Sequence, residues 1–362
     1  MQLIASLDPD SESGPITTIQ PTETLQPESC LASPLLSVPP EIIAEIFLHF
    51  LPSYPEPPPV VAPLLLSRIC RHWRQIALST PLLWRAIHMP LREHELPEAR
   101  ARKLNLLDTW LSRSGDCSLS ISLHYILHRA FNSESSPTVS QFLDAIVRHA
   151  SRWEYLDLHM PFEDLSIIQG DMPRLRDLTF GPCELPKNDD PAVFQLFDCA
   201  PQLTKVVLTE CFVPLVIPLP WSQITHLKGL CLYAHECGEL LSAATNLVHC
   251  IMALCGGSDV PIPPIPPHLH IRTLILHVVE ETQISLDVLL DRITLPALCT
   301  LRFTEHAVSR NGPLTAVGYL LSRSQCTLED LFVDDASLPE SAYRRALLSV
   351  RTITLRGPTT IA

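Results

Sequence analysis

The sequence has few glycines, few charged side chains and no long apolar run. Glycine occurs 11 times in 362 residues and proline 35 times, so many short elements are ended by proline rather than by glycine. The longest charge-free apolar run with membrane character, FVPLVIPLPW at 212–221, has ten residues, three of them prolines. That run is too short to cross a bilayer as a helix, so no membrane-spanning segment is expected.

Signals for secretion and lipid attachment are also missing. The first residues, MQLIASLDPDSESG, are acidic and lack the basic start and apolar core of a secretion signal. The chain holds no N-x-S/T sequon and no lipidation motif. We therefore expect a cytoplasmic or nuclear protein, whose 12 cysteines would be reduced thiols.

The charge balance narrows the functional class. Asp and Glu outnumber Lys and Arg by 39 to 26, which gives a formal net charge of −13. Binding to nucleic acid depends on Lys and Arg side chains that neutralise phosphates, so no nucleic-acid partner is expected. At 362 residues the chain is long enough for one large or two modest domains. Because 46% of the residues are hydrophobic and 18% are charged, most of its length is expected to be a packed globular protein.

Motifs that carry enzyme chemistry are absent from the sequence. It contains no glycine-rich phosphate loop, no G-x-S-x-G elbow and no H-E-x-x-H pair. His, Asp and Ser are scattered, so any catalytic set assembled from them would be arbitrary. We therefore predict a non-catalytic protein, with no catalytic residue, cofactor or metal ligand assigned.

Three regions differ in composition. Residues 1–35 are rich in Pro, Ser, Thr, Glu and Asp with little apolar periodicity, which predicts a disordered tail. Residues 36–89 have apolar side chains at helical spacing, and residues 90–362 hold an internal repeat.

The second region predicts two main helices. The first helix has one apolar stripe, formed by Ile42, Ile46, Phe47 and Leu51. The second helix has one apolar face, formed by Leu65, Ile69, Trp73, Ile76 and Ala77. Pro81 ends this helix, and LLWRAIH at 82–88 closes the unit. Because this unit is small, it cannot bury all these side chains by itself. It needs contacts with the rest of the chain or with a partner.

This region resembles the F-box motif over about 50 residues. The positions that carry the resemblance are Val38, Pro39, Glu41, Ile42, Ile46, Phe47, Leu51, Leu65, Ile69, Cys70, Trp73, Leu83 and Trp84. The family pattern opens with Leu-Pro where this chain has Val38-Pro39, and the loop at 55–63 is longer than usual. The stretch LDTWLSRSGDCSLSISL at 107–123 is similar to the segment after the F-box in fungal, mushroom-type members.

The resemblance implies the substrate-recognition subunit of an SCF-type ubiquitin ligase. In such proteins the F-box docks a SKP-type adaptor, which links to a cullin, and the rest of the chain holds a target protein. One alternative is a protein-interaction scaffold outside any ligase, and another is an unrecognised enzyme or metal protein. For the F-box-like apolar residues themselves, the alternative is that they form only a core. The nearby Arg68, Arg71, Arg74 and Arg85 are interpreted mainly as a solvated face that can complement an acidic partner.

The third region repeats a short pattern. LRDLTFGPCEL at 175–185 and LTKVVLTECFV at 203–213 fit L-x-x-L-x-L-x-x-N/C-x-L, with Phe or Val allowed for Leu. The second apolar positions of nine copies, 20 to 30 residues apart, are Leu156, Leu178, Val206, Leu230, Cys250, Leu274, Leu301, Leu331 and Ile353. With helical stripes between several copies, the repeat predicts an α/β, leucine-rich-repeat-like solenoid of short parallel strands.

Residues between the buried positions of a solenoid line its concave face. The predicted target-binding residues are Tyr155, Asp157, Lys205, Val207, Tyr233, Ile251, Ile275, His277, Arg302 and Phe332. Such a mixture of aromatic, aliphatic and charged residues suits protein recognition. For any single one of them, the simpler interpretation is that it faces water.

One stretch gathers side chains of the metal-ligand type: Cys231, His235, Cys237, His249, Cys250 and Cys255. The chain contains no C-x-x-C pair, and this spacing fits no common zinc module. The repeat favours a structural role for the cysteines instead, because its N/C position is occupied by Cys183, Cys211 and Cys255. A small side chain there can pack at the turn where a strand ends.

Overall fold

The computed structural model describes residues 38–51, 54, 62–93, 95–126, 138–183, 196–197, 199–209, 218–256, 260–279, 285–308 and 312–357. The predicted tail at 1–35, most of the loop at 55–63 and Cys211 lie outside these residues.

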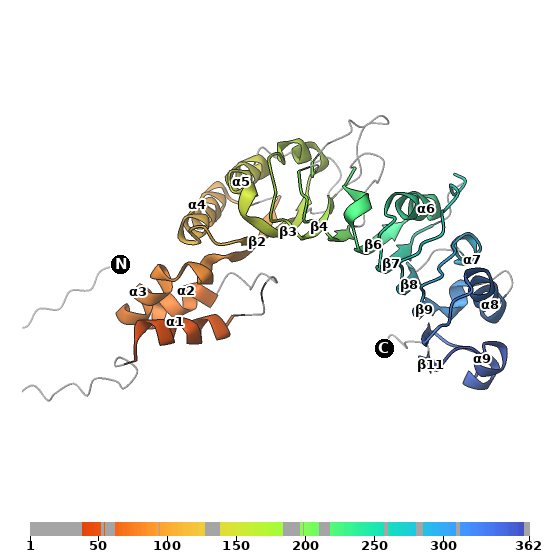
Figure 1. Ribbon diagram of the computed structural model, residues 1–362. Coiled ribbons are helices and arrows are strands. Elements are labelled where there is room, and N and C mark those ends of the chain that lie inside the picture. Colours follow the sequence, from red (N-terminus) through yellow and green to blue (C-terminus); the bar gives the residue numbers. More distant parts are fainter. Residues whose placement is uncertain are drawn as a thin grey trace, which may run out of the picture.

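The described chain begins with a helical unit made of α1 (Pro40–His49), α2 (Ala62–Ile69), α3 (Arg71–Ser79) and the 3-10 helix η2 (Pro81–Trp84). Prolines start both α1 and η2, where a missing backbone N–H costs no helical hydrogen bond. Figure 1 shows the unit packed beside one end of a curved sheet.

The prediction of one continuous second helix is wrong, because this segment forms two helices, α2 and α3. Cys70 has extended backbone angles between α2 and α3, and its Sγ accepts a hydrogen bond from the backbone N–H of Trp73 at 3.4 Å. Cys70 therefore caps α3 and breaks the helical continuity. As a result Leu65 and Ile69 of α2 face solvent, whereas Ile76 of α3 is buried.

Within the described residues, eleven parallel strands form one sheet whose spatial order is the order of the sequence. The strands are β1 (Ala86–Arg92), β2 (Leu119–Ile126), β3 (Trp153–Met160), β4 (Asp177–Pro182), β5 (Lys205–Leu208), β6 (His226–Leu232), β7 (His249–Leu254), β8 (Thr273–Val278), β9 (Thr300–Thr304), β10 (Asp330–Asp334) and β11 (Thr352–Leu355). Sequential parallel pairing of this kind is the topology of a solenoid.

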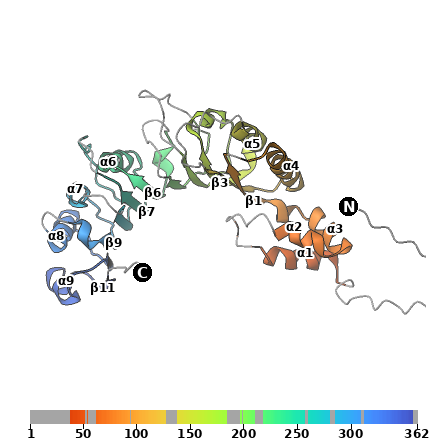
Figure 2. The ribbon, with the colours of Figure 1, turned by 180° about the vertical axis from the view of Figure 1, so that it is seen from behind.

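Helices and 3-10 turns return the chain from one strand to the next. The α-helices are α4 (Pro97–Arg113), α5 (Thr138–Val147), α6 (Ala234–Ala243), α7 (Asp287–Leu290), α8 (Pro313–Ser324) and α9 (Glu340–Ala346). The 3-10 helices are η3 (Ala150–Arg152), η4 (Phe162–Ile167), η5 (Trp221–Gln223) and η6 (Glu305–Ala307). The strands lie along the inner side of an arc and the helices along its outer side (Figures 1 and 2). The inner side is the concave face.

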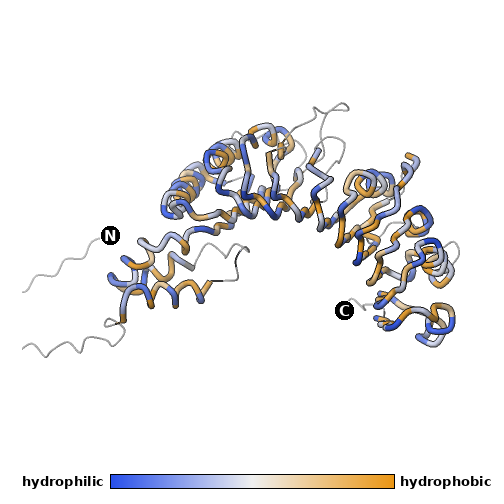
Figure 3. Tube along the Cα trace, viewed as in Figure 1, coloured by the Kyte–Doolittle hydropathy of each residue, from blue (hydrophilic) through white to orange (hydrophobic). Residues whose placement is uncertain are grey.

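The strand pairing confirms eight of the nine predicted repeat positions. Leu156, Leu178, Val206, Cys250, Leu274, Leu301, Leu331 and Ile353 stand in one register column with Ile87 and Ile121. All of these side chains are buried. Along a strand, buried positions alternate with more exposed ones, as expected for strands with one buried face, and Figure 3 shows apolar and hydrophilic segments interspersed through the strand layer of the arc.

The prediction of Leu230 in this column is wrong. Leu227 pairs with Val206 and Cys250, and the register between β6 and β7 shifts between Gly229 and Leu232. A Cβ on Gly229 would lie 2.3 Å from Leu232 Cδ1, so glycine leaves the space that the buried Leu232 occupies. Leu230 falls within the irregular part of the strand and is only half-buried.

A hydrogen-bond ladder joins the repeats just before their strands. The carbonyl of Thr204 accepts from the backbone N–H groups of Thr225 and His226, at 2.9 and 3.0 Å. The carbonyl of Thr225 in turn accepts from Val248 and His249, at 2.8 and 3.0 Å. Each turn therefore satisfies backbone groups of the next one, which a single repeat cannot do alone.

The helical unit and the sheet share one hydrophobic core. It runs from Ile43 and Phe47 in α1 through Trp84 and Trp110 to Ile353 in β11. Strand β1 starts only two residues after η2 ends, so the boundary that the sequence places at residue 89 falls inside this strand. Among the helices that the structure describes, none is both long and apolar enough to cross a membrane.

Candidate functional site

Two surfaces of the chain present side chains that can bind a partner: the helical unit and the concave face. On the helical unit, helix spacing separates an inner row from an outer row. Ile43, Phe47 and Leu66 are buried in the core. The outer row is Ile42, Ile46, Phe50, Leu65 and Ile69, whose side chains are 53, 55, 66, 47 and 60% exposed. We call these five residues the helical apolar surface.

A groove lies between α1 and α2 within this surface. Its volume is about 360 Å³, and it is lined by Ile46, Phe47, Phe50, Leu65, Leu66, Ile69 and Trp73. Trp73 packs edge-on against Phe47, with ring centroids 4.9 Å apart, and forms the inner wall. Exposed apolar side chains around an apolar groove are typical of surfaces that bind another protein.

The residues that carry the resemblance divide by burial. Phe47, Leu83 and Trp84 are buried, and the indole N–H of Trp84 donates to the Ala77 carbonyl at 2.7 Å, so these three serve the core. Val38, Leu51, Cys70 and Trp73 are half-buried, whereas Pro39, Glu41, Ile42, Ile46, Leu65 and Ile69 are exposed. The sequence analysis missed Phe50, whose place four residues after Ile46 is the available signal.

The arginines of the unit are not all solvated. Arg68, Arg71 and Arg74 are exposed, as predicted. Arg85 instead stacks its guanidinium 3.8 Å from the centroid of the Tyr54 ring. The hydroxyl of Tyr54 donates to Glu154 Oε2 at 2.9 Å, and burial together with this bond raises the pKa of Tyr54 above its usual value. This bond links Tyr54 to Glu154 near the start of β3.

The concave face carries nine of the ten predicted residues on strands, with side chains on the side opposite the core. The exception is Tyr233, which follows β6 and stands at the N-cap position of α6, where its backbone N–H donates to Glu236 Oε2 at 2.8 Å. The prediction that Tyr233 lies between buried strand positions on the concave face is therefore wrong. The cause is the register shift in β6 that also misplaces Leu230.

One register row runs across the strands of this face. Its members on β5 to β10 are Val207, Lys228, Ile251, Ile275, Arg302 and Phe332, paired in that order, and Asp157 of β3 lies further along the same row. Lys228 was not predicted because its repeat was misaligned. Within the row, Arg302 Nε and Nη2 donate to Oδ2 and Oδ1 of the neighbouring Asp334 at 2.6 and 3.1 Å, a paired arrangement that holds the guanidinium in place.

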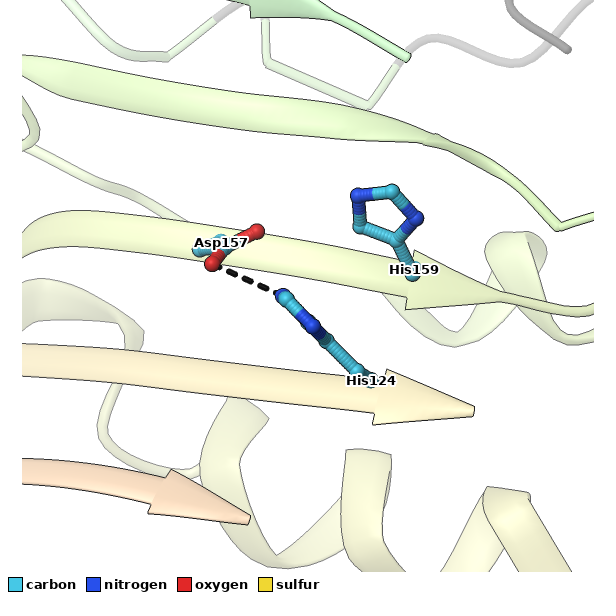
Figure 4. Close-up of side chains that lie close together, drawn as sticks. All are labelled: His124, Asp157 and His159. Carbon is cyan, nitrogen blue, oxygen red and sulfur yellow. Dashed lines mark hydrogen bonds and ion pairs between the residues drawn. The ribbon is translucent and has the colours of Figure 1, made fainter. Parts of the chain in front are cut away.

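A second group on the concave face lies nearer the helical unit. His124 Nε2 of β2 is 2.8 Å from Asp157 Oδ2 of β3, and Ser122 Oγ donates to the same oxygen at 2.9 Å. The rings of His124 and His159 have centroids 4.6 Å apart. Figure 4 shows the two imidazoles and the carboxylate side by side on β2 and β3.

Sequence reasoning found only Asp157 of this group, as a target-binding candidate. His124 and His159 are 35 residues apart in sequence and become neighbours through the pairing of β2 with β3. The available signal was an alignment of SISLHYI at 120–126 with the later strand YLDLHM at 155–160, which places one histidine opposite the other.

The cysteines of the repeat sit at strand ends and in the core. Cys183 and Cys255 donate their backbone N–H groups to the carbonyls of Met160 and Leu232 at 3.0 and 2.9 Å, so both extend the ladder beyond the strand. Burial raises the pKa of the Cys250 thiol to about 12, and Cys237 is also fully buried. These thiols are therefore protonated packing groups near neutral pH.

Comparison of the sequence with models of known protein families gives no match, and no curated protein matches it at a significant level. Function is therefore argued from the two surfaces themselves.

Proposed function

We propose that the chain is the substrate-recognition subunit of an SCF-type ubiquitin ligase. The helical unit acts as an F-box that docks a SKP-type adaptor, and the leucine-rich-repeat-like solenoid holds a target protein on its concave face. The observation that carries the proposal is the exposure of Ile42, Ile46, Leu65 and Ile69, because these members of the F-box-like pattern are not used by the chain's own core.

The energetics of the helical apolar surface favour a protein partner. Full burial of an exposed Ile or Leu side chain contributes about 1.5–3 kcal/mol, and part of this gain is still available at Ile46 and Ile69, which are 55 and 60% exposed. The groove between α1 and α2 gives an incoming apolar side chain contacts on two sides. The exposed Arg68 lies on α2, and the exposed Arg71 and Arg74 lie on α3 next to it; these charges suit an adaptor with acidic groups at the rim.

The mechanism requires no catalytic side chain in this chain. The adaptor fixes the helical unit to the cullin, and the shared core fixes the helical unit to the solenoid. A target bound on the concave face is then held near the ubiquitin-loaded enzyme, which raises its effective concentration there. The rigid connection through Trp84 and Trp110 suits this role, since a flexible joint would lower that concentration.

Co-purification of the full chain with a SKP-type adaptor tests the docking step. Ile46→Asp places a charge in the groove without removing a core side chain, and we expect it to abolish capture. Truncating a central anchor of such an interface costs about 2–4 kcal/mol, and a buried charge costs more. Leu348→Asp is the matched control, because Leu348 is 87% exposed on the far part of the solenoid.

Both variants must give the circular dichroism spectrum of the wild type. Capture that persists in folded Ile46→Asp, or no capture by the wild type, contradicts adaptor docking. Capture without ubiquitin transfer to a concave-face partner, in a reconstituted ligase, favours the alternative of a protein-interaction scaffold.

A further inference from the structure

The pairing of β2 with β3 brings together two histidines and one carboxylate. His124 stands directly opposite His159, and Asp157 precedes His159 by two residues, so all three side chains project from the same face. One ligand atom from each, two ring nitrogens and a carboxylate oxygen, lies within 4.8 Å of the other two. Figure 4 shows that the three come from only two strands, whose relative position is fixed by their hydrogen bonds.

Asp157 has unused ligand capacity. Its side chain is only 13% exposed, and Oδ2 already accepts hydrogen bonds from His124 Nε2 and Ser122 Oγ. Its other oxygen, Oδ1, is shielded from solvent and has no hydrogen-bond partner. A shielded carboxylate oxygen without a partner is unfavourable, and a cation beside it removes that cost.

We propose that His124, Asp157 and His159 bind a divalent transition-metal ion of the zinc class. Imidazole nitrogen and carboxylate oxygen are ligands that this ion accepts, and three protein ligands leave the fourth tetrahedral position to water. Ser122, which is buried, holds Asp157 by its hydrogen bond and acts as the outer-shell partner that orients a ligand. The site is independent of adaptor docking.

The required movements are small. Metal–ligand bonds of about 2.0–2.1 Å in a tetrahedron place neighbouring ligand atoms about 3.3 Å apart. His124 Nε2 now contacts Asp157 Oδ2 at 2.8 Å, and this hydrogen bond is given up when the imidazole turns to an ion held at the partnerless Oδ1. The His159 ring must approach the pair by rotation of its side chain, while the paired strands stay in place.

Titration of the metal-free full chain with Zn²⁺, in competition with a chromophoric chelator, tests the site. We expect one ion per chain, and a loss of affinity of at least 100-fold in His159→Ala and in Asp157→Asn. The matched control is His249→Ala. His249 stacks on His226 of the same sheet at 4.6 Å, and among the described residues this pair belongs to no three-ligand group.

A second measurement on the unmodified chain does not depend on the variants folding. Co²⁺ in place of Zn²⁺ is expected to give the strong visible absorption of a four-coordinate site. The weak absorption of six-coordinate Co²⁺, an absence of stoichiometric Zn²⁺ binding, or binding that persists unchanged in folded His159→Ala and Asp157→Asn overturns the proposal.

Discussion

Trp84 and Trp110 pack edge to face, with ring centroids 4.8 Å apart and ring planes at 72°. Trp84 belongs to η2 and Trp110 to α4, so this contact joins the helical unit to the first helix of the solenoid. Both rings are almost completely buried, and the indole N–H of Trp110 donates to the Ala86 carbonyl at 3.1 Å. The two parts of the chain are therefore one packed body at this junction.

Trp110→Ala is expected to destabilise both parts together. Removal of a buried tryptophan leaves a cavity and costs about 3–5 kcal/mol. Because Trp84 loses its neighbour, the helical unit and the first repeats should unfold in one transition at lower denaturant concentration. Denaturant unfolding followed by circular dichroism measures this effect, with Trp221→Ala, at a half-buried position, as the milder control. An unchanged midpoint would show that the junction does not contribute to stability.

The repeat could be predicted from sequence because its signal is local. Each strand needs buried apolar side chains at alternate positions, so Leu178 and Val206 mark their strands by spacing alone. The exposed Ile42 and Ile46 were also identifiable, although periodicity does not distinguish an outer apolar row from an inner one. Only the packed structure shows that Ile43 and Phe47 occupy the core and leave the other row free.

What sequence reasoning missed depends on register and on single residues. Leu230 fits the repeat pattern as well as Leu227 does, and the choice is decided by the space that Gly229 leaves for Leu232. The break at Cys70 interrupts an apparently continuous helical pattern. Likewise, His124 and His159 become neighbours only through the pairing of two strands, which no local pattern specifies.

Glu305 is expected to stabilise the C-terminal repeats. It is buried, and its carboxylate accepts from Ser337 N, Ser337 Oγ and Tyr343 Oη at 2.9, 2.5 and 2.9 Å. Glu305→Ala leaves these donors without their acceptor and should lower the free energy of unfolding by about 2–4 kcal/mol. Denaturant titration provides the measurement.

The control for Glu305 is a carboxylate on the surface. Glu340 forms an exposed pair with Arg344 at 2.6 Å, and Glu340→Ala should cost less than about 0.5 kcal/mol.

Tyr343→Phe should cost about 1–2 kcal/mol, and this loss should not add to that of Glu305→Ala, since the two side chains share one hydrogen bond. Full additivity of the two changes would contradict the network.

Asp164 is expected to make stability depend on pH. Burial, followed by the neighbouring charge of Glu163, raises the pKa of Asp164 to about 6 from 3.8, and its Oδ2 has no hydrogen-bond partner. The folded state therefore favours the protonated acid. Its contribution is most favourable below about pH 4, falls as the pH rises through about 6, and stays low above that value.

Asp164→Asn removes this dependence. At pH 7.5 the variant should be more stable than the wild type by about 1 kcal/mol, after allowance for partial solvent access, and near pH 3.5 the difference should disappear. Thermal unfolding at the two pH values measures it, with the exposed Asp171→Asn as control. A variant that is less stable at pH 7.5 would mean that the Asp164 carboxylate is satisfied in the folded chain.

Two glycines should respond in opposite directions to a single methyl group. A Cβ at Gly229 would lie 2.3 Å from Leu232 Cδ1 and 2.9 Å from its Cγ, and Leu232 is completely buried, so Gly229→Ala must displace a core side chain. We expect the free energy of unfolding to fall by about 1–3 kcal/mol.

Gly318 lies inside α8 with nothing within 4 Å of its Cβ position, so Gly318→Ala should raise the free energy of unfolding by about 0.5–1 kcal/mol through helix propensity. Parallel denaturant titrations compare the two, and a neutral Gly229→Ala would show that the irregular end of β6 can reach the regular register that the repeat pattern predicts.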